Sequence, residues 1–389
     1  MSRMLLTGTG GRLTEDDCRI ADLKAVLDEA TDPVRYPHAA AVEQGVLVYD
    51  AESLRGATAS EAGLWDVRAE LVRALTDGPG VVVFRGAFPD RTVVDRATAE
   101  FEELIVEQRA SGAVAGDHFA PPGANDRVWN ALEKLALRAP EVFVDYYAND
   151  VLALVASAWL GPGYQMTSQV NVVNPGGTAQ VGHRDYHLGF LPIASIEQYP
   201  AHVHRLSPVL TLQGAVAHSD MPVESGPTLY LPHSQKYEPG YLATNLPEFR
   251  EFFETHHVQL PLRTGDAAFF NPAVIHGAGH NRSTDIRRMA NLLQVSSAFG
   301  RAMESVDRER MCLSLYAALR ARGAAAAGPA IAAAAEGYAF PTNLDRDPPI
   351  GGLAPPSQAD LVRRALAESW DKETFRAELT AHSARRRTV

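Results

Sequence analysis

Four side chains in the second half of the chain have the types and spacing of a metal centre: His183, Asp185, His276 and Arg287. Two imidazoles and one carboxylate are the ligand set with which non-heme iron(II) oxygenases hold a metal and leave positions open for O2. Residues i and i+2 of an extended segment point to the same side, so His183 and Asp185 can reach one ion. His276 ends a short apolar run, and eleven residues later the planar guanidinium of Arg287 can grip a carboxylate.

The sequence around these residues resembles the phytanoyl-CoA dioxygenase-like family of Fe(II)/2-oxoglutarate oxygenases, which includes ectoine hydroxylase. The resemblance covers residues 65–300 and is most specific in the segment that begins Ile275-His276-Gly277-Ala278-Gly279. The other three similar segments are Gly80-Val81-Val82-Val83-Phe84-Arg85-Gly86-Ala87-Phe88-Pro89, Gly182-His183-Arg184-Asp185-Tyr186-His187 and Glu224-Ser225-Gly226-Pro227-Thr228-Leu229-Tyr230-Leu231-Pro232-His233-Ser234-Gln235-Lys236.

The resemblance implies a mononuclear centre in which His183, Asp185 and His276 bind Fe(2+) and carry the catalytic role. 2-Oxoglutarate would chelate the iron as co-substrate, O2 would take the last position, and ascorbate would serve as an activator in vitro. Arg287 would bind the 5-carboxylate of 2-oxoglutarate. Four polar or soft side chains on neighbouring predicted strands are further candidates for contact with the co-substrate: Met166, Gln169, Asn171 and Gln213.

Two positions depart from the family pattern. The segment Pro232-His233-Ser234-Gln235 stands where the family usually has Pro-Gly-Ser-His, and Ala278 stands where a small hydroxyl residue often helps to bind the co-substrate. Asp185 agrees with the pattern of oxygenating members, because halogenating relatives lack this carboxylate. Oxygen insertion or desaturation is therefore the expected chemistry.

Two neighbouring residues compete with the predicted ligands. Arg288 follows Arg287 directly, and neighbours on a strand face opposite ways, so only one of them points into a barrel. The eleven-residue offset selects Arg287 as the inward residue and places Arg288 on the outer face. His187 is the next same-face position after Asp185. It is left out of the metal set, because histidines beside a metal more often support the ligands than join them.

The order of elements predicts an α+β fold. Helical patterns occupy most of the chain up to about residue 163, including 60–76, 91–109 and 151–159, and short strand patterns follow, among them 166–173 and 288–296. Helices followed by many short strands favour an antiparallel barrel or sandwich. The resemblance implies a double-stranded β-helix, the jelly-roll, cupin-like core of these oxygenases, with flanking N-terminal and C-terminal helices.

We therefore expect three parts: an N-terminal helical extension at 1–64, an oxygenase jelly-roll domain at 65–300 and a C-terminal helical extension at 301–389. In the last part the pattern predicts one amphipathic helix at 357–381. The three arginines at 385–387 are expected to be a solvated, frayed end.

Composition narrows the class of protein. A formal net charge of −11 argues against a nucleic-acid-binding surface and gives no support to a polybasic membrane contact. The first residues, 1–8, lack the apolar stretch of a signal peptide, and no window has the length of a membrane span. Cys18 and Cys312 are far apart in the sequence, so their spacing indicates neither a disulfide framework nor a thiolate metal site. Such cysteine usage fits a reducing, cytoplasmic location.

Two other classes of function remain open. One is a cupin-like metalloenzyme without redox chemistry, such as an isomerase or hydrolase, which would give Arg287 no task. The other is a metal-free jelly-roll binding module. For the substrate, no cluster of Lys and Arg marks a coenzyme A phosphate site, so a small carrier-free metabolite is preferred. The sequence does not determine the oligomeric state.

Overall fold

The computed structural model describes residues 11–111 and 123–388. The chain forms two compact units that interleave along the sequence. The first contains Met1–Ala87, Ala115–Arg127 and Asn171–Leu292, and the second contains Phe88–Val114, Val128–Val170 and Leu293–Val389. The expected division at residues 64/65 and 300/301 remains a prediction.

Eleven strands occur in the described residues. They are β1 (Ala41–Glu43), β2 (Val46–Asp50), β3 (Val81–Arg85), β4 (Asn125–Val128), β5 (Gln165–Val173), β6 (Thr211–Ala217), β7 (Leu229–Leu231), β8 (Val258–Gln259), β9 (Ala267–Phe270), β10 (Ile275–Gly277) and β11 (Arg288–Ser296). Strands β4, β5 and β11 run through both units, and each of the others lies wholly in the first.

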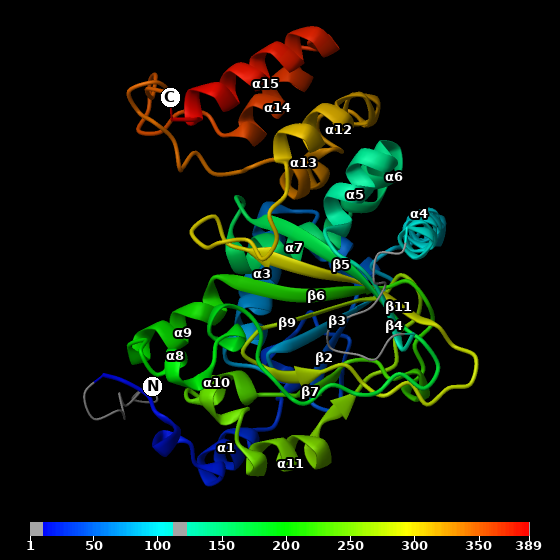
Figure 1. The fold of residues 1–389 in the computed structure, drawn as a ribbon, viewed down its shortest axis with the longest axis vertical. Helices are drawn as coiled ribbons and strands as arrows, with labels where there is room; N and C mark the ends of the chain where they lie inside the picture. Colours follow the sequence, from blue (N-terminus) through cyan, green and yellow to red (C-terminus); the bar gives the residue numbers. More distant parts are fainter. Residues whose placement is uncertain (1–10, 112–122, 389) are drawn as a thin grey trace. The chain divides into compact units, whose positions relative to one another are not determined.

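The strands form two sheets. The larger has the order β1-β2-β3-β9-β6-β11-β5-β4, and the smaller has the order β10-β7-β8 (Figure 1). An isolated antiparallel bridge between His183 and His276 extends the smaller sheet by one short segment. All described pairings in the first unit are antiparallel except that of β2 with β3. These facing sheets confirm the predicted α+β class and the double-stranded β-helix core.

The core of the first unit lies between the two sheets. Val48, Val83, Ala268 and Phe270 project from the larger sheet and pack in one cluster with Tyr230 of β7. Alternation along each strand sends every second side chain into this layer, which explains the valine-rich patterns of β2 and β3. The metal ligands described below lie at the edge of this apolar interior.

Helices complete both units. In the first unit they are α1 (Ile20–Leu27), α2 (Ala51–Ala57), α3 (Glu61–Thr76), α8 (Ile193–Ile196), α9 (Ala201–Val209), α10 (Gly240–Ala243) and α11 (Pro247–His256), with short 3-10 turns at Glu15–Asp17, Pro33–Arg35, His187–Phe190, Val223–Ser225 and Ser234–Lys236. The predicted helix at 60–76 is confirmed. Ser60 caps α3 by accepting a hydrogen bond from the Gly63 amide, and Val67 and Leu71 bury its apolar face.

The second unit is largely helical. Its helices are α4 (Arg91–Ala110), α5 (Ala131–Arg138), α6 (Pro140–Tyr147), α7 (Asp150–Leu160), α12 (Arg308–Arg322), α13 (Gly328–Ala334), α14 (Gln358–Ala367) and α15 (Lys372–Arg386). The predicted helices at 91–109 and 151–159 correspond to α4 and α7. No helix within 11–111 or 123–388 has the length and apolarity to cross a membrane.

The C-terminal prediction was wrong in two respects. The expected single helix at 357–381 is two helices, because Ser369 adopts a left-handed conformation (φ 56°) and Asp371 caps a new helix. The terminal arginines are not frayed: Arg385 Nε lies 3.1 Å from Asp347 Oδ1, and Arg387 Nη2 lies 3.4 Å from Glu309 Oε2. Asp347 is buried, so this carboxylate anchors the end of the chain.

Candidate metal centre

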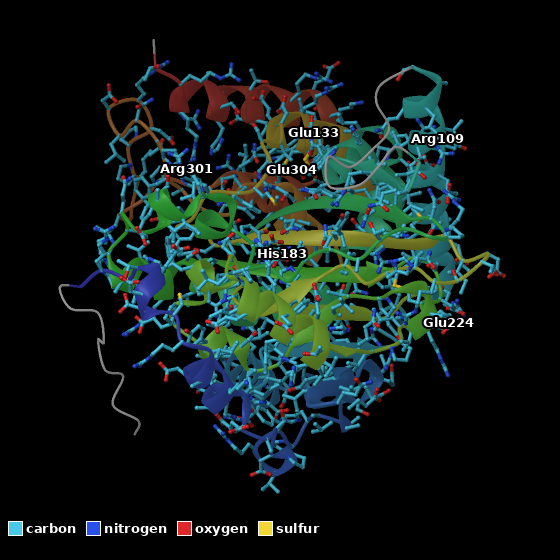
Figure 2. The ribbon with its side chains drawn as sticks, turned by 60° about the horizontal axis from the view of Figure 1, so that its bottom comes forward. Arg109, Glu133, His183, Glu224, Arg301 and Glu304 are labelled. Carbon is cyan, nitrogen blue, oxygen red and sulfur yellow. The ribbon has the colours of Figure 1, made fainter. Side chains whose placement is uncertain are left out.

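The first unit brings His183, Asp185 and His276 together as predicted. One ligand atom from each lies within 4.8 Å of the others, and no other metal-competent group of His, Cys, Asp and Glu occurs in the described residues. His183 Nε2 is 3.4 Å from Asp185 Oδ1, and His276 Nε2 is 3.5 Å from Asp185 Oδ2. His183, labelled in Figure 2, lies among the green strands of this unit.

Backbone pairing holds the two histidines side by side. The amide of each donates to the carbonyl of the other, at 2.9 and 3.0 Å. His276 lies on β10 opposite Tyr230 of β7, so its ring faces the core and lies 4.6 Å from the ring of Phe270. Asp185 is tethered to the loop between β9 and β10, since its amide donates to the Pro272 carbonyl at 3.3 Å.

Both imidazoles are oriented for metal binding. His183 Nδ1 lies 2.8 Å from the Val181 carbonyl, and His276 Nδ1 lies 3.0 Å from the Val274 carbonyl. A carbonyl only accepts, so each Nδ1 carries the proton and each Nε2 presents a lone pair toward Asp185. Burial also lowers the pKa of His183, which favours the neutral form that binds a metal.

The carboxylate is kept ionised. Burial by itself raises the pKa of Asp185, but His183 and His276, together with a hydrogen bond from Gln213, hold it below its ordinary value. Gln213 lies on β6, and its Nε2 donates to Asp185 Oδ2 at 2.5 Å. Two imidazole nitrogens and one carboxylate oxygen are a donor set that fits a divalent iron ion.

The prediction for the two arginines was wrong in orientation. The Arg287 side chain is 43 % exposed, with Nη2 3.9 Å from Asp126 Oδ2, whereas Arg288 is only 6 % exposed. Burial lowers the pKa of Arg288 to about 10, with Tyr230 opposing the shift. The cause of the error is the strand register. β11 begins at Arg288, so an offset counted from His276 cannot decide which neighbour faces inward.

Arg288 has no partner of its own. Within residues 11–111 and 123–388, its guanidinium makes no hydrogen bond or ion pair. A buried cation without a counter-ion is costly unless an anion binds to it. Arg288 is close enough to Tyr230, which pairs with His276, for the two side chains to interact electrostatically, so its guanidinium is available to an anionic group in this part of the unit.

The other residues predicted to contact the co-substrate, on strand β5, are divided between the two units. Asn171 is in the first unit, and its buried Oδ1 has no hydrogen-bond partner there. Met166 and Gln169 belong to the second unit. The Met166 carbonyl accepts from Arg308, and Gln169 Nε2 lies 3.8 Å from Met303 Sδ. Roles for Met166, Gln169 and Asn171 in binding the co-substrate remain predictions.

His187 lies outside the metal group. Tyr186 and His187 both have positive φ, at 62° and 40°, so the backbone turns after Asp185 and the expected same-face position does not exist. His187 Nδ1 instead contacts Ser207 Oγ at 2.9 Å, and that hydroxyl is 3.4 Å from the Tyr241 hydroxyl. Such strain beside a metal ligand is typical of a functional segment.

The departure at His233 has a structural account. The residue is left-handed (φ 70°), a conformation for which glycine is preferred. Its ring is fixed on both sides, with Nε2 3.0 Å from Thr31 Oγ1 and Nδ1 2.9 Å from Lys236 Nζ. The next residue, Ser234, accepts from the Ile275 amide at 2.8 Å and so fixes β10, the strand of His276.

The chain is similar to several known proteins. The multifunctional dioxygenase ausE of Emericella nidulans is 25 % identical over 237 residues, which cover 52 % of this chain and 76 % of that protein. The solved structure of SnoK, a non-heme alpha-ketoglutarate-dependent carbocyclase from nogalamycin biosynthesis, is 22 % identical with a TM-score of 0.43, over 59 % of this chain and 83 % of SnoK. HygX from Streptomyces hygroscopicus, solved with nickel, 2-oxoglutarate and hygromycin B, is 18 % identical with a TM-score of 0.42, over 61 % and 90 % of the two chains.

The family profile described as phytanoyl-CoA dioxygenase (PhyH) matches residues 76–289, which is more than half of the chain. The matched range contains His183, Asp185 and His276 as well as both arginines. The chain belongs to the phytanoyl-CoA dioxygenase (PhyH) family and is a 2-oxoglutarate-dependent dioxygenase.

Proposed function

We propose that the protein hydroxylates or desaturates an unactivated C–H bond of a small-molecule metabolite and releases succinate and CO2. The observation that carries the proposal is the buried, unpaired Arg288 in the unit that holds the His183, Asp185 and His276 triad. A metalloenzyme without an acidic co-substrate, or a binding module without a metal, gives such a cation no task.

In this proposal His183, Asp185 and His276 hold Fe(2+) through Nε2, a carboxylate oxygen and Nε2. Iron with 2-oxoglutarate and O2 supplies the oxidising chemistry when bound there, and ascorbate maintains the reduced metal in vitro. Arg288 binds the 5-carboxylate through its two-donor fork and so orients the co-substrate. The apolar core at Tyr230 and Phe270 keeps water from this ion pair and strengthens it.

The composition of the chain supports the proposed substrate class. The net charge of −11 does not favour a polyanionic carrier, and the sequence contains no cluster of Lys and Arg that would mark a site for coenzyme A phosphates. A carrier-free metabolite is the proposed substrate.

The test uses Fe(II) and 2-oxoglutarate under anaerobic conditions. Chelation should produce a weak visible charge-transfer band, and admission of O2 with ascorbate should release succinate slowly even without the primary substrate. His183→Ala, Asp185→Ala and His276→Ala should each lose both signals. His257→Ala is the matched control, because that ring contacts Phe253 and its backbone rather than the triad. Absence of the band in the wild-type protein would overturn the 2-oxoglutarate assignment.

A further inference from the structure

The carboxamide of Gln213 is in direct contact with the triad. It lies in the middle of β6, opposite Phe270 of β9, and is 4 % exposed. Its Nε2 donates to Asp185 Oδ2, while its Oε1 is buried without a hydrogen-bond partner. The side chain is therefore held in place by the carboxylate and by the strand that carries it.

This contact distinguishes the two oxygens of Asp185. Oδ2 accepts the Gln213 hydrogen bond, whereas Oδ1 faces His183 Nε2 at 3.4 Å without such a donor. A carboxylate oxygen that accepts a short, charge-assisted hydrogen bond is a poorer metal ligand than its free neighbour, since part of its charge is already neutralised. Oδ1 is thus the oxygen left for a metal.

The number of oxygens that bind decides how many coordination positions stay open. Three protein donors would leave three of the six positions of an octahedral ion for other ligands. If both oxygens of Asp185 chelated the metal, one of those positions would be lost. The local backbone does not prevent this by itself, because the Asp185 backbone is fixed by the hydrogen bond from its amide to the Pro272 carbonyl, which leaves the carboxylate free to rotate.

We propose that Gln213 is a positioning residue that keeps Asp185 monodentate and thereby keeps one coordination position free for the reaction. This inference rests on the proposed metal site but not on the identity of the co-substrate or substrate. The unpartnered Oε1 adds a second task, since it offers an acceptor to a donor group on whatever ligand occupies the open side.

The experiment uses Co(II) alone as a spectroscopic probe. We would measure its dissociation constant by competition with a chromophoric chelator, and its coordination number from the intensity of the visible d–d bands. Gln213→Met keeps the length of the side chain but removes the donor. It should weaken Co(II) binding about 10-fold to 100-fold, as loss of a group that supports a ligand does in other sites. The d–d spectrum should change with the new binding mode of Asp185.

A double-mutant cycle distinguishes an effect that Gln213 exerts through Asp185 from a general loss of packing. In an Asp185→Ala background, Gln213→Met should change Co(II) affinity by less than about twofold, because the residue through which it acts is gone. Gln235→Met is the control variant. It removes a glutamine of the same unit whose amide donates to the carbonyls of Thr76 and Gly78 rather than to the triad, and it should leave Co(II) affinity and spectrum unchanged.

Two results would overturn the proposal. One is a Gln213→Met protein that binds Co(II) as tightly as the wild type with the same spectrum. The other is an equal loss of affinity with and without Asp185, which would assign Gln213 to the packing of β6. Because no 2-oxoglutarate is added, failure of the co-substrate assignment leaves this result readable. Wild-type protein that binds no Co(II) would instead overturn the metal centre itself.

Discussion

Arg184 and Arg288 are both buried in the first unit, and burial lowers the pKa of each to about 10. Their surroundings differ completely. Arg184 Nη2 donates to the carbonyls of Ser234 and Tyr237, at 2.6 and 2.8 Å, and the guanidinium lies over the ring of Tyr241. Arg288 has no such partner in the described part of the chain. One cation is used to build the fold, and the other is available for a ligand.

Arg184 also helps to position the metal-binding triad. Arg184 stands between His183 and Asp185, and alternation directs it away from the metal while its neighbours face it. Its bonds to the loop after β7 fix that segment, which also holds β10 through Ser234. The arginine that never touches the metal therefore sets the position of the residues that do.

The largest expected effect concerns the affinity for 2-oxoglutarate. Arg288→Met should raise the dissociation constant about 30-fold to several thousandfold, because a carboxylate would lose a buried charge-assisted partner worth about 2–5 kcal/mol. Arg287→Met, at the exposed neighbour, should change it less than about threefold. Anaerobic titration of each Fe(II)-loaded variant gives the constants. The reverse ranking would restore the orientation predicted from the eleven-residue offset.

Replacing Arg184 and replacing Arg288 should have different effects on the free energy of unfolding. Arg184→Met leaves the carbonyls of Ser234 and Tyr237 buried without a donor, so the free energy of unfolding should fall by about 2–5 kcal/mol. Arg288→Met removes an unpaired buried charge and should be neutral or stabilising. Denaturant unfolding of the apo-proteins measures both. Equal destabilisation would mean that Arg288 is also structural.

A substitution next to Arg184 sharpens the comparison. A Cβ at Gly240 would lie 2.2 Å from Arg184 Nη2. Gly240→Ala must therefore displace the Arg184 guanidinium from the carbonyls of Ser234 and Tyr237. We expect a loss of about 1–3 kcal/mol. Gly56→Ala is the control, since that glycine is in helix α2 with open space around it, and alanine should be neutral or slightly stabilising there. Thermal unfolding of the two variants should separate them, and similar melting temperatures would show that Arg184 is loosely held.

The smallest expected effect is the contribution of His233 to the pH dependence of stability. This buried imidazole has a partner at each ring nitrogen. Burial, with Lys236 nearby, lowers its pKa to about 4. An unfolded imidazole takes up its proton near pH 6.5, so between these values the unfolded state binds more protons and stability falls as the pH is lowered. The lowered pKa of His233 should reduce the free energy of unfolding by about 1–2 kcal/mol between pH 7 and pH 5.

His233→Gln should remove this part of the pH dependence. The measurement is the free energy of unfolding of both proteins at several pH values across that window. Parallel curves for the two proteins would show that His233 does not titrate differently in the folded state. Because other buried histidines such as His218 also have a lowered pKa, only the difference between the curves is informative.

The sequence by itself determined the parts of this protein that depend on local pattern. The i, i+2 spacing of His183 and Asp185 was sufficient to place both on one side of an extended segment, and helical periodicity was sufficient for α3 and α4. Residue type also indicated a metal site, since two imidazoles and one carboxylate are a donor set that binds divalent ions.

Tertiary structure alone decided the rest. Which of Arg287 and Arg288 faces inward depends on where β11 joins the sheet, and a shift of one residue reverses both. The contact of Gln213 with Asp185 joins β6 to a loop, and no sequence interval encodes that distance. The two helices where one was predicted, and the carboxylate of Asp347 that anchors the last arginines, likewise depend on residues brought together by folding. Periodicity specifies which face of an element is buried, but the pairing of distant elements specifies what that face meets.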